Sequence, residues 1–343
     1  MKKQSPTPIA IVLLIFAILA CNLPAAVPTN EQPLSPGASN PPAATSEVAT
    51  PNITESTATP TVSIAHTLTP AANQSSGKPI YDVDSSGTAP EKRAPYGDSY
   101  DINRLERPFL QDMTYVPDLD IGTFSLSYDA NFYYVSIDLI GNDPNNPMGI
   151  QYGVELDVNA DGFGDFIVLG KQPFSKDWST ANVQVFADNN RDTSGLSADK
   201  SDAPITTDGY EKLIYDGSAG TNTDPDLAWV RINFSDAANI QFSFKKSLAG
   251  SSFMYGVIAD GGLKDVGKLD YVDRFKEAEA GSPVKDKKYY PLGALFAVDN
   301  TCREVFGFKP TGYEPMLCPR DQPNPTRKAT NAPTPVPPPP PIP

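Results

Sequence analysis

The sequence predicts an all-β protein: a jelly-roll-like antiparallel β-sandwich over residues 80–320, with a short disulfide-closed C-terminal segment and disordered Pro-rich tails on both sides. Two observations predict the sandwich. Apolar side chains such as Tyr133, Val135 and Ile137 recur at every second position, which is the period of a strand with one buried face. No stretch in 100–275 shows an amphipathic helical repeat of ten or more residues.

The runs with this period are separated by Gly, Asn and Asp clusters, which are typical of turns. About nine short strands joined by such turns favour two packed antiparallel sheets, and about 220 residues is within the range of one sandwich domain. In chain order, the expected strands are 121–128, 133–139, 150–158, 166–170, 182–187, 210–215, 227–234, 239–246 and 253–259.

The distribution of proline sets the limits of the folded part. Of the 36 prolines, twelve lie in 1–79 and ten in 321–343, which leaves 14 in 80–320. Residues 22–79 are mostly Pro, Thr, Ser, Ala and Asn, so this stretch cannot bury enough apolar area to offset its backbone entropy. We therefore expect a disordered linker over 21–79 and a disordered tail over 321–343.

The first 20 residues are predicted to be a lipoprotein signal peptide. Lys2 and Lys3 are followed by an uncharged apolar run, 9–19, of 11 residues, whereas a membrane-spanning helix needs about 20. The run ends in Ile18-Leu19-Ala20-Cys21, which resembles the bacterial lipobox. The resemblance implies that Cys21 is lipidated and that the protein is an exported, membrane-anchored cell-surface lipoprotein. An ordinary signal peptide is the alternative.

Charge and histidine content exclude several functions. Only four acidic and five basic residues lie outside 80–320, so this domain holds 37 of the 41 acidic and 22 of the 27 basic side chains. An acidic surface repels phosphate backbones, so no nucleic-acid partner is expected. The only histidine, His66, lies in the Pro-rich tract. Catalytic triads, Cys-His dyads and histidine-ligated metals are therefore not expected in the domain, and the prediction is a protein that is not an enzyme.

Cys302 and Cys318 are the two cysteines that remain after lipidation of Cys21. They belong to a chain that we expect to be exported, and they enclose 15 residues of turn-rich sequence. We predict a disulfide between them, which stabilises the fold by roughly 3 kcal/mol and closes a C-terminal segment onto the sandwich.

The segment 157–165 has oxygen-bearing side chains at its positions 1, 3, 5 and 9 and glycine at position 6, as in the first part of an EF-hand-type calcium loop. It resembles the loops of dockerins and thrombospondin type 3 repeats. Because it joins two expected strands, a Ca²⁺ ion would stabilise a hairpin here; a polar turn is the alternative. The ligands that the resemblance implies are Asp157, Asn159, Asp161, Asp165 and the carbonyl of Phe163.

A second acidic loop repeats part of this pattern. Asp188, Asn190 and Asp192 have the spacing of the first three ligands, but the loop lacks the glycine, and Arg191 adds a positive charge. A weaker calcium site or an ordinary hairpin loop are both compatible with it.

Trp178 is the aromatic residue that we expect to be exposed, because it lies in the polar loop 175–179. A flat ring on the surface can stack on the apolar face of a sugar, so Trp178 is a candidate ligand-binding residue. Most other aromatic side chains are expected in the core, among them Tyr133 and Tyr152.

Three segments, 117–121, 132–137 and 152–157 with its acidic loop, resemble the DOMON and family 9 carbohydrate-binding module-like sandwiches. The resemblance covers roughly 115–260. It implies an exported sandwich that binds sugar or haem and often carries structural calcium. The lack of histidine in the domain favours sugar over haem.

Together, these features predict a membrane-anchored, surface-displayed, calcium-stabilised binding module for a glycan or a cell-envelope polysaccharide. Two alternatives remain. One is an extracellular glycoside hydrolase or lyase that uses paired carboxylates, for which Asp138 and Glu155 are candidates. The other is a structural or adhesive envelope protein without a small ligand.

Overall fold

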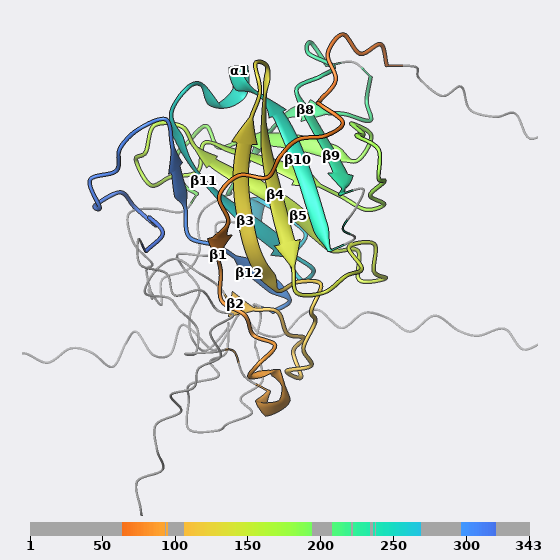
Figure 1. Cartoon of the computed structure of the whole chain (residues 1–343), viewed down its shortest axis with the longest axis vertical. Helices are drawn as coiled ribbons and strands as arrows, with labels where there is room; N and C mark the ends of the chain where they lie inside the picture. The colour runs from red at the N-terminus through yellow and green to blue at the C-terminus, as the bar shows by residue number, and fades with distance from the viewer. Residues whose placement is uncertain are drawn as a thin grey trace, which may run out of the picture. The chain divides into compact units, whose positions relative to one another are not determined.

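The computed structural model describes residues 64–92, 94, 106–193, 208–220, 222–233, 236, 238–268 and 296–319 (Figure 1). The predicted signal peptide, the lipidation site Cys21, most of the predicted linker and the C-terminal tail 321–343 lie outside these residues. Within the described part, no helix is long and apolar enough to cross a membrane.

Two antiparallel sheets form a sandwich, which confirms the predicted fold class. The first sheet has five strands in the order β1-β3-β4-β10-β9. Their bounds are β1 Ile80–Tyr81, β3 Ile121–Tyr128, β4 Phe132–Leu139, β9 Ala228–Ile232 and β10 Asn239–Lys245.

The second sheet has the order β2-β12-β11-β5-β6-β7-β8, and β13 also pairs with β11. Its strands are β2 Glu106–Arg107, β5 Gln151–Asp157, β6 Phe166–Gly170, β7 Val183–Ala187, β8 Lys212–Asp216, β11 Phe253–Asp260, β12 Val298–Asn300 and β13 Glu304–Phe306. Among the described residues, the helical elements are α1, Lys246–Ala249, and the 3₁₀ turns η1, Ala89–Glu91, and η3, Val266–Lys268.

Each of the nine expected runs coincides with a strand, from β3 to β11. Four strands were not predicted: β1, β2, β12 and β13. Each has only two or three residues, so none is long enough to show an apolar period.

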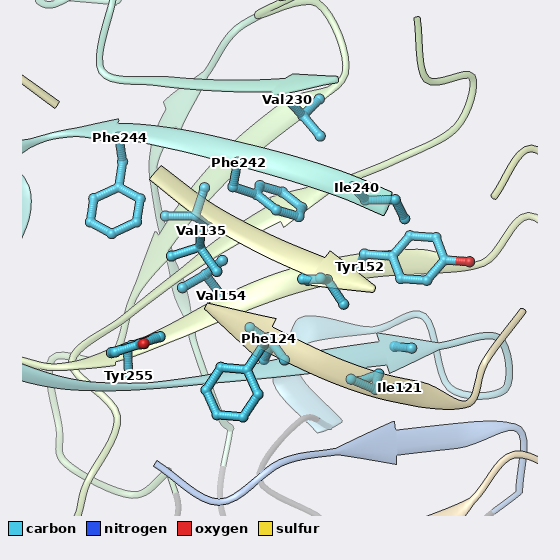
Figure 2. Packing of buried hydrophobic residues seen from close by; sticks show 14 of the residues in the cluster. Ile121, Phe124, Val135, Tyr152, Val154, Val230, Ile240, Phe242, Phe244 and Tyr255 are labelled. Carbon is cyan, nitrogen blue, oxygen red and sulfur yellow. The ribbon is translucent and has the colours of Figure 1, made fainter. Parts of the chain in front are cut away.

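The core lies between the two sheets. Figure 2 shows Phe124, Val135 and Phe242 from the first sheet gathered with Val154 and Tyr255 from the second. Alternate residues of each strand fill this space, as the period of two predicts. The same cluster includes Tyr133 and Tyr152, which are buried as expected.

The outer face of the first sheet is covered by the strap, our name for residues 64–79. This segment precedes β1 and crosses the sheet in Figure 1. The Ala71 N–H donates to Tyr134 Oη (2.8 Å), and Arg231 Nη1 donates to the Ala72 carbonyl (2.9 Å). The predicted linker 21–79 therefore contains an ordered part. Its composition did not reveal this, because the strap is held by polar side chains of the sheet and adds few apolar contacts of its own, such as that of Ala71.

The start of the strap binds one buried carboxylate. Asp226 accepts hydrogen bonds from Thr67 N–H (3.0 Å), Thr67 Oγ1 (2.7 Å) and Leu68 N–H (2.9 Å), and His66 Nδ1 lies 2.8 Å from its other oxygen. The His66 ring also contacts Trp229, with 4.5 Å between ring centroids. The expectation that the folded unit lacks histidine is thus wrong, because His66 belongs to it.

The predicted disulfide is confirmed: Cys302 and Cys318 are bonded, and both side chains are buried in the core cluster. Between them, the Arg303 N–H donates to the Met316 carbonyl (2.8 Å), and the Cys318 N–H donates to the Arg303 carbonyl (2.8 Å). The C-terminal segment is therefore held beside β13 by the disulfide and by backbone hydrogen bonds.

We expect the double variant Cys302→Ala/Cys318→Ala to unfold with a free energy about 3 kcal/mol lower than the wild type, because the unfolded chain loses a loop constraint. Urea unfolding under non-reducing conditions measures this. A reducing agent should lower the stability of the wild type by a similar amount and leave the double variant unchanged. Equal stability of the two oxidised proteins would contradict the prediction.

Burial acts to raise the pKa of Asp226, but the hydrogen bonds from Thr67, His66 and Leu68 outweigh it and hold the pKa below its ordinary value. A lowered pKa in the folded state means that the carboxylate stabilises the fold above the unfolded pKa of about 3.9. This stability is lost as the pH falls through the lower, folded pKa.

We therefore expect Asp226→Asn to be less stable than the wild type at pH 7 by about 1.5–3 kcal/mol, the usual contribution of hydrogen bonds to a charged group. The variant should also lose less stability than the wild type between pH 5 and pH 2. Urea unfolding across this range tests both points, and parallel pH profiles would refute the role of Asp226.

Candidate functional site

The two acidic loops predicted from the sequence are neighbours in the structure. The Asp188 N–H donates to the Asp165 carbonyl (3.1 Å), and Thr193 Oγ1 donates to the Gly164 carbonyl (2.8 Å). The first loop follows β5 and the second follows β7, and these strands both pair with β6. Strand pairing thus brings the two loops to the same end of the sheet.

The two loops share a local hydrogen-bond pattern. Asp157 accepts from the N–H groups of Asp161 (3.2 Å) and Gly162 (2.9 Å). Asp188 accepts from the corresponding N–H groups of Asp192 (3.0 Å) and Thr193 (2.9 Å). The repeated Asp-x-Asn-x-Asp spacing therefore folds in the same way in both places, although only the first loop has the glycine.

Arg303 compensates part of the negative charge of the first loop. Arg303 is fully buried, and its Nη1 donates to Asp157 Oδ2 (3.1 Å) and to the Gly162 carbonyl (3.0 Å), while Nη2 lies 2.9 Å from Glu155 Oε1. Burial raises the pKa of Asp157, and Arg303 acts in the opposite direction. A cation in this loop would share Asp157 with a guanidinium.

The remaining predicted ligands are also engaged in the loops. Asp161 pairs with Arg191 across the loops, and Arg191 lies over the ring of Phe163, 5.1 Å from its centroid. Asp165 accepts the Val158 N–H (2.7 Å). In the second loop, Asn190 Nδ2 donates to Asp192 Oδ2 (3.0 Å) and Asp208 Oδ1 (2.7 Å), and Asn159 Oδ1 accepts the Asp161 N–H (2.9 Å). Calcium at these loops stays a prediction.

Trp178 is partly covered. The Arg231 guanidinium lies over its ring, 4.3 Å from the centroid, and Nε1–H donates to the Ala71 carbonyl of the strap (3.0 Å). The sequence could not show this cover, because the strap and β9 are distant from the loop that holds Trp178.

The carboxylates proposed for a hydrolase are held apart. Asp138 lies in β4 of the first sheet, where it accepts from Thr123 Oγ1 (2.5 Å) and Asn239 Nδ2 (2.6 Å). Glu155 lies in β5 of the second sheet, where it binds Arg303 and accepts from the Tyr210 hydroxyl (2.5 Å). Each carboxylate is therefore bound by its own partners in a different sheet.

An open groove of about 460 Å³ separates the sheet edges at β1 and β13. Its lining residues combine aromatic rings with two charged groups: Lys78, Tyr81, Leu126, Tyr255, Glu304 and Phe306. Tyr128, which is 56% exposed, packs edge-on against the Phe306 ring with 5.4 Å between centroids. An exposed aromatic ring therefore stands beside the groove. The groove could not be predicted from the sequence, because most of its lining residues lie in or beside the short, unpredicted strands β1 and β13.

A cluster of buried carboxylates was also not predicted. Asp82, Glu106 and Asp299 are nearly or fully buried, and they can each place one oxygen so that all three lie within 4.8 Å of one another. Asp120, also fully buried, interacts electrostatically with Asp82 and Asp299. The four residues come from distant parts of the chain and form no sequence motif.

Burial strongly disfavours ionisation in this cluster. It raises the pKa of Asp120 to about 8, although the Tyr115 hydroxyl and the Ser85 N–H donate to the carboxylate. Burial, followed by the charges of Glu106 and Asp82, raises the pKa of Asp299 well above its ordinary value. An uncompensated buried carboxylate costs several kcal/mol, so the cluster needs a compensating positive charge or protons.

Comparison with protein-family models, curated proteins and solved structures finds no match. The geometry described above therefore carries the functional argument.

The two arginines of the acidic loop allow a matched test. We expect Arg303→Met to lower the free energy of unfolding by about 3–5 kcal/mol, because it leaves the buried Asp157 and the partly buried Glu155 without their cation. Arg191→Met removes a pair whose arginine side chain is 60% exposed, and it should change stability by at most about 1 kcal/mol. Urea unfolding at pH 7 measures both changes, and equal losses would contradict this assignment.

Proposed function

We propose that this protein is a membrane-anchored, surface-displayed binding module that holds a glycan or cell-envelope polysaccharide in the groove between β1 and β13. The observation that carries the proposal is the composition of that groove, with the rings of Tyr81 and Phe306 beside the charged groups of Lys78 and Glu304.

This combination suits a sugar. A pyranose has an apolar face, which packs on an aromatic ring, and hydroxyls around its rim, which exchange hydrogen bonds with charged groups. The volume of about 460 Å³ is within the range of about 300–1,000 Å³ for sites that hold small ligands. The exposed ring of Tyr128 extends the apolar surface beyond the groove, so a chain of several sugar units has room to continue.

The predicted signal peptide and linker, residues 1–79, support a display role. A lipid at Cys21 and a Pro-rich linker would hold the domain away from the membrane, and the strap leads directly from that linker to β1 at the groove. The resemblance to DOMON and family 9 carbohydrate-binding module-like sandwiches favours a sugar as ligand. Calcium at Asp157–Asp165, and at the second loop, remains part of this proposal and is supported by the shared turn geometry.

The groove is tested by polysaccharide pull-down and glycan-array binding with the full-length chain. We expect Lys78→Met and Glu304→Gln each to weaken binding about 10-fold or more, because each removes a charge-assisted hydrogen bond of about 1.5–3 kcal/mol. Lys212→Met is the matched control, because Lys212 is also an exposed lysine but lies in β8, at the other end of the sheet from β12 and β2.

Thermal melting should show all three variants within about 2 °C of the wild type, since surface substitutions usually change stability little. The wild type failing to bind any glycan would refute the proposed ligand class. Binding that is unaffected by Lys78→Met and Glu304→Gln would refute the groove as the binding site.

A further inference from the structure

We propose that one Ca²⁺ ion binds among the buried carboxylates of Asp82, Glu106 and Asp299, beside Asp120, and that it joins the two sheets. This site is separate from the two acidic loops and from the groove, and it does not depend on the identity of the ligand.

The register of the strands places two acids face to face. In the pairing of β2 with β12, Glu106 is opposite Asp299 and Arg107 is opposite Val298. Directly opposed residues share one face of a sheet, and like charges in such a pair repel each other. The alternation along β2 places Arg107 on the other face from Glu106. A cation between the two carboxylates turns this repulsion into attraction.

In the described structure, Oδ1 of Asp299 and Oδ1 of Asp120 have no hydrogen-bond partner. Both residues are 0% exposed, so water does not reach these atoms from the surface. Buried polar atoms are almost always satisfied, and an oxygen of an ionised carboxylate can only accept a hydrogen bond or bind a cation.

The other oxygen of each carboxylate is fixed. Asp299 Oδ2 accepts the Ile121 N–H (2.7 Å), and Asp120 Oδ2 accepts the Ser85 N–H (3.0 Å) and the Tyr115 hydroxyl (2.5 Å). Ser85 also donates through Oγ to Glu106 Oε1 (2.5 Å). These bonds hold the carboxylates in place before an ion binds, as the second shell of a metal site does.

The spacing and the chemistry of the oxygens fit calcium. The ligand atoms of Asp82, Glu106 and Asp299 lie within 4.8 Å of one another, and two ligands on opposite sides of Ca²⁺ are separated by about 4.6–5.2 Å. All four side chains are carboxylates, which are hard ligands, and the cluster has no histidine or cysteine for zinc. Mg²⁺ usually keeps several water molecules, whereas Ca²⁺ accepts carboxylates from many directions.

The ion would connect elements of both sheets. Asp82 follows β1 and Asp120 precedes β3, and these strands belong to the five-stranded sheet. Glu106 lies in β2 and Asp299 in β12, at the end of the other sheet. Figure 1 shows β1, β2 and β12 at the same end of the molecule. The calcium ion would therefore stabilise this end of the sandwich.

The test uses the full-length chain after chelation. We expect added Ca²⁺ to bind and to raise the melting temperature by about 5 °C or more. Asp299→Asn, which keeps the shape of the side chain, should weaken calcium binding about 100-fold, because it removes a charged ligand. Asp177→Asn, at an exposed aspartate outside the cluster and the two acidic loops, is the matched control and should keep the high-affinity binding and the melting shift.

Hydrogen exchange of the wild type locates the ion without relying on a variant. Calcium should slow exchange at the Ile121 amide, which donates to Asp299, and in 298–300, and should leave 183–187 unchanged. A calcium affinity and a melting shift in Asp299→Asn equal to those of the wild type would overturn the proposal. So would protection confined to 157–165, or a chelated protein that neither binds Ca²⁺ nor changes its melting temperature.

Discussion

Compensation of buried carboxylate charge is the constraint on which the rest of this sandwich depends. Removing an ionised carboxylate from water costs several kcal/mol unless a partner replaces the lost hydration. The fold meets this demand differently in each place. Arg303 compensates Asp157, and backbone and hydroxyl donors of the strap compensate Asp226. The buried carboxylates of Asp82, Glu106 and Asp299 are where we propose a calcium ion. Part of the domain's excess of acidic side chains thus lies in its interior and not on its surface.

The main strands could be predicted because their information is local. From β3 to β11, apolar residues alternate along each strand, and that alternation depends only on which face the sheet buries. The disulfide was also predictable, since only two cysteines were left to pair. The short strands β1, β2, β12 and β13 depend on pairing with longer neighbours, and two or three residues contain no period from which to infer a strand.

The acidic loops could be located from the sequence because the oxygen-bearing residues of each loop lie within one short stretch, 157–165 or 188–192. The cluster of Asp82, Glu106, Asp120 and Asp299 could not, since its members are brought together only by strand pairing across more than 200 positions of the chain. The strap was missed for a related reason. Composition measures how much apolar surface a segment can bury by itself, whereas the strap uses donors and acceptors that Tyr134, Asp226 and Arg231 provide.

The order of contacts along the strap has a mechanical consequence. A pull on the chain from its N-terminal side first loads the bonds of residues 66–68 to Asp226, then those of Ala71 and Ala72 to Tyr134, Trp178 and Arg231, and only then β1. These bonds break one after another instead of all at once, so the strap peels from the sheet at a lower force than strands sheared along their length. The first sixteen described residues can thus lengthen under tension while the two packed sheets stay intact.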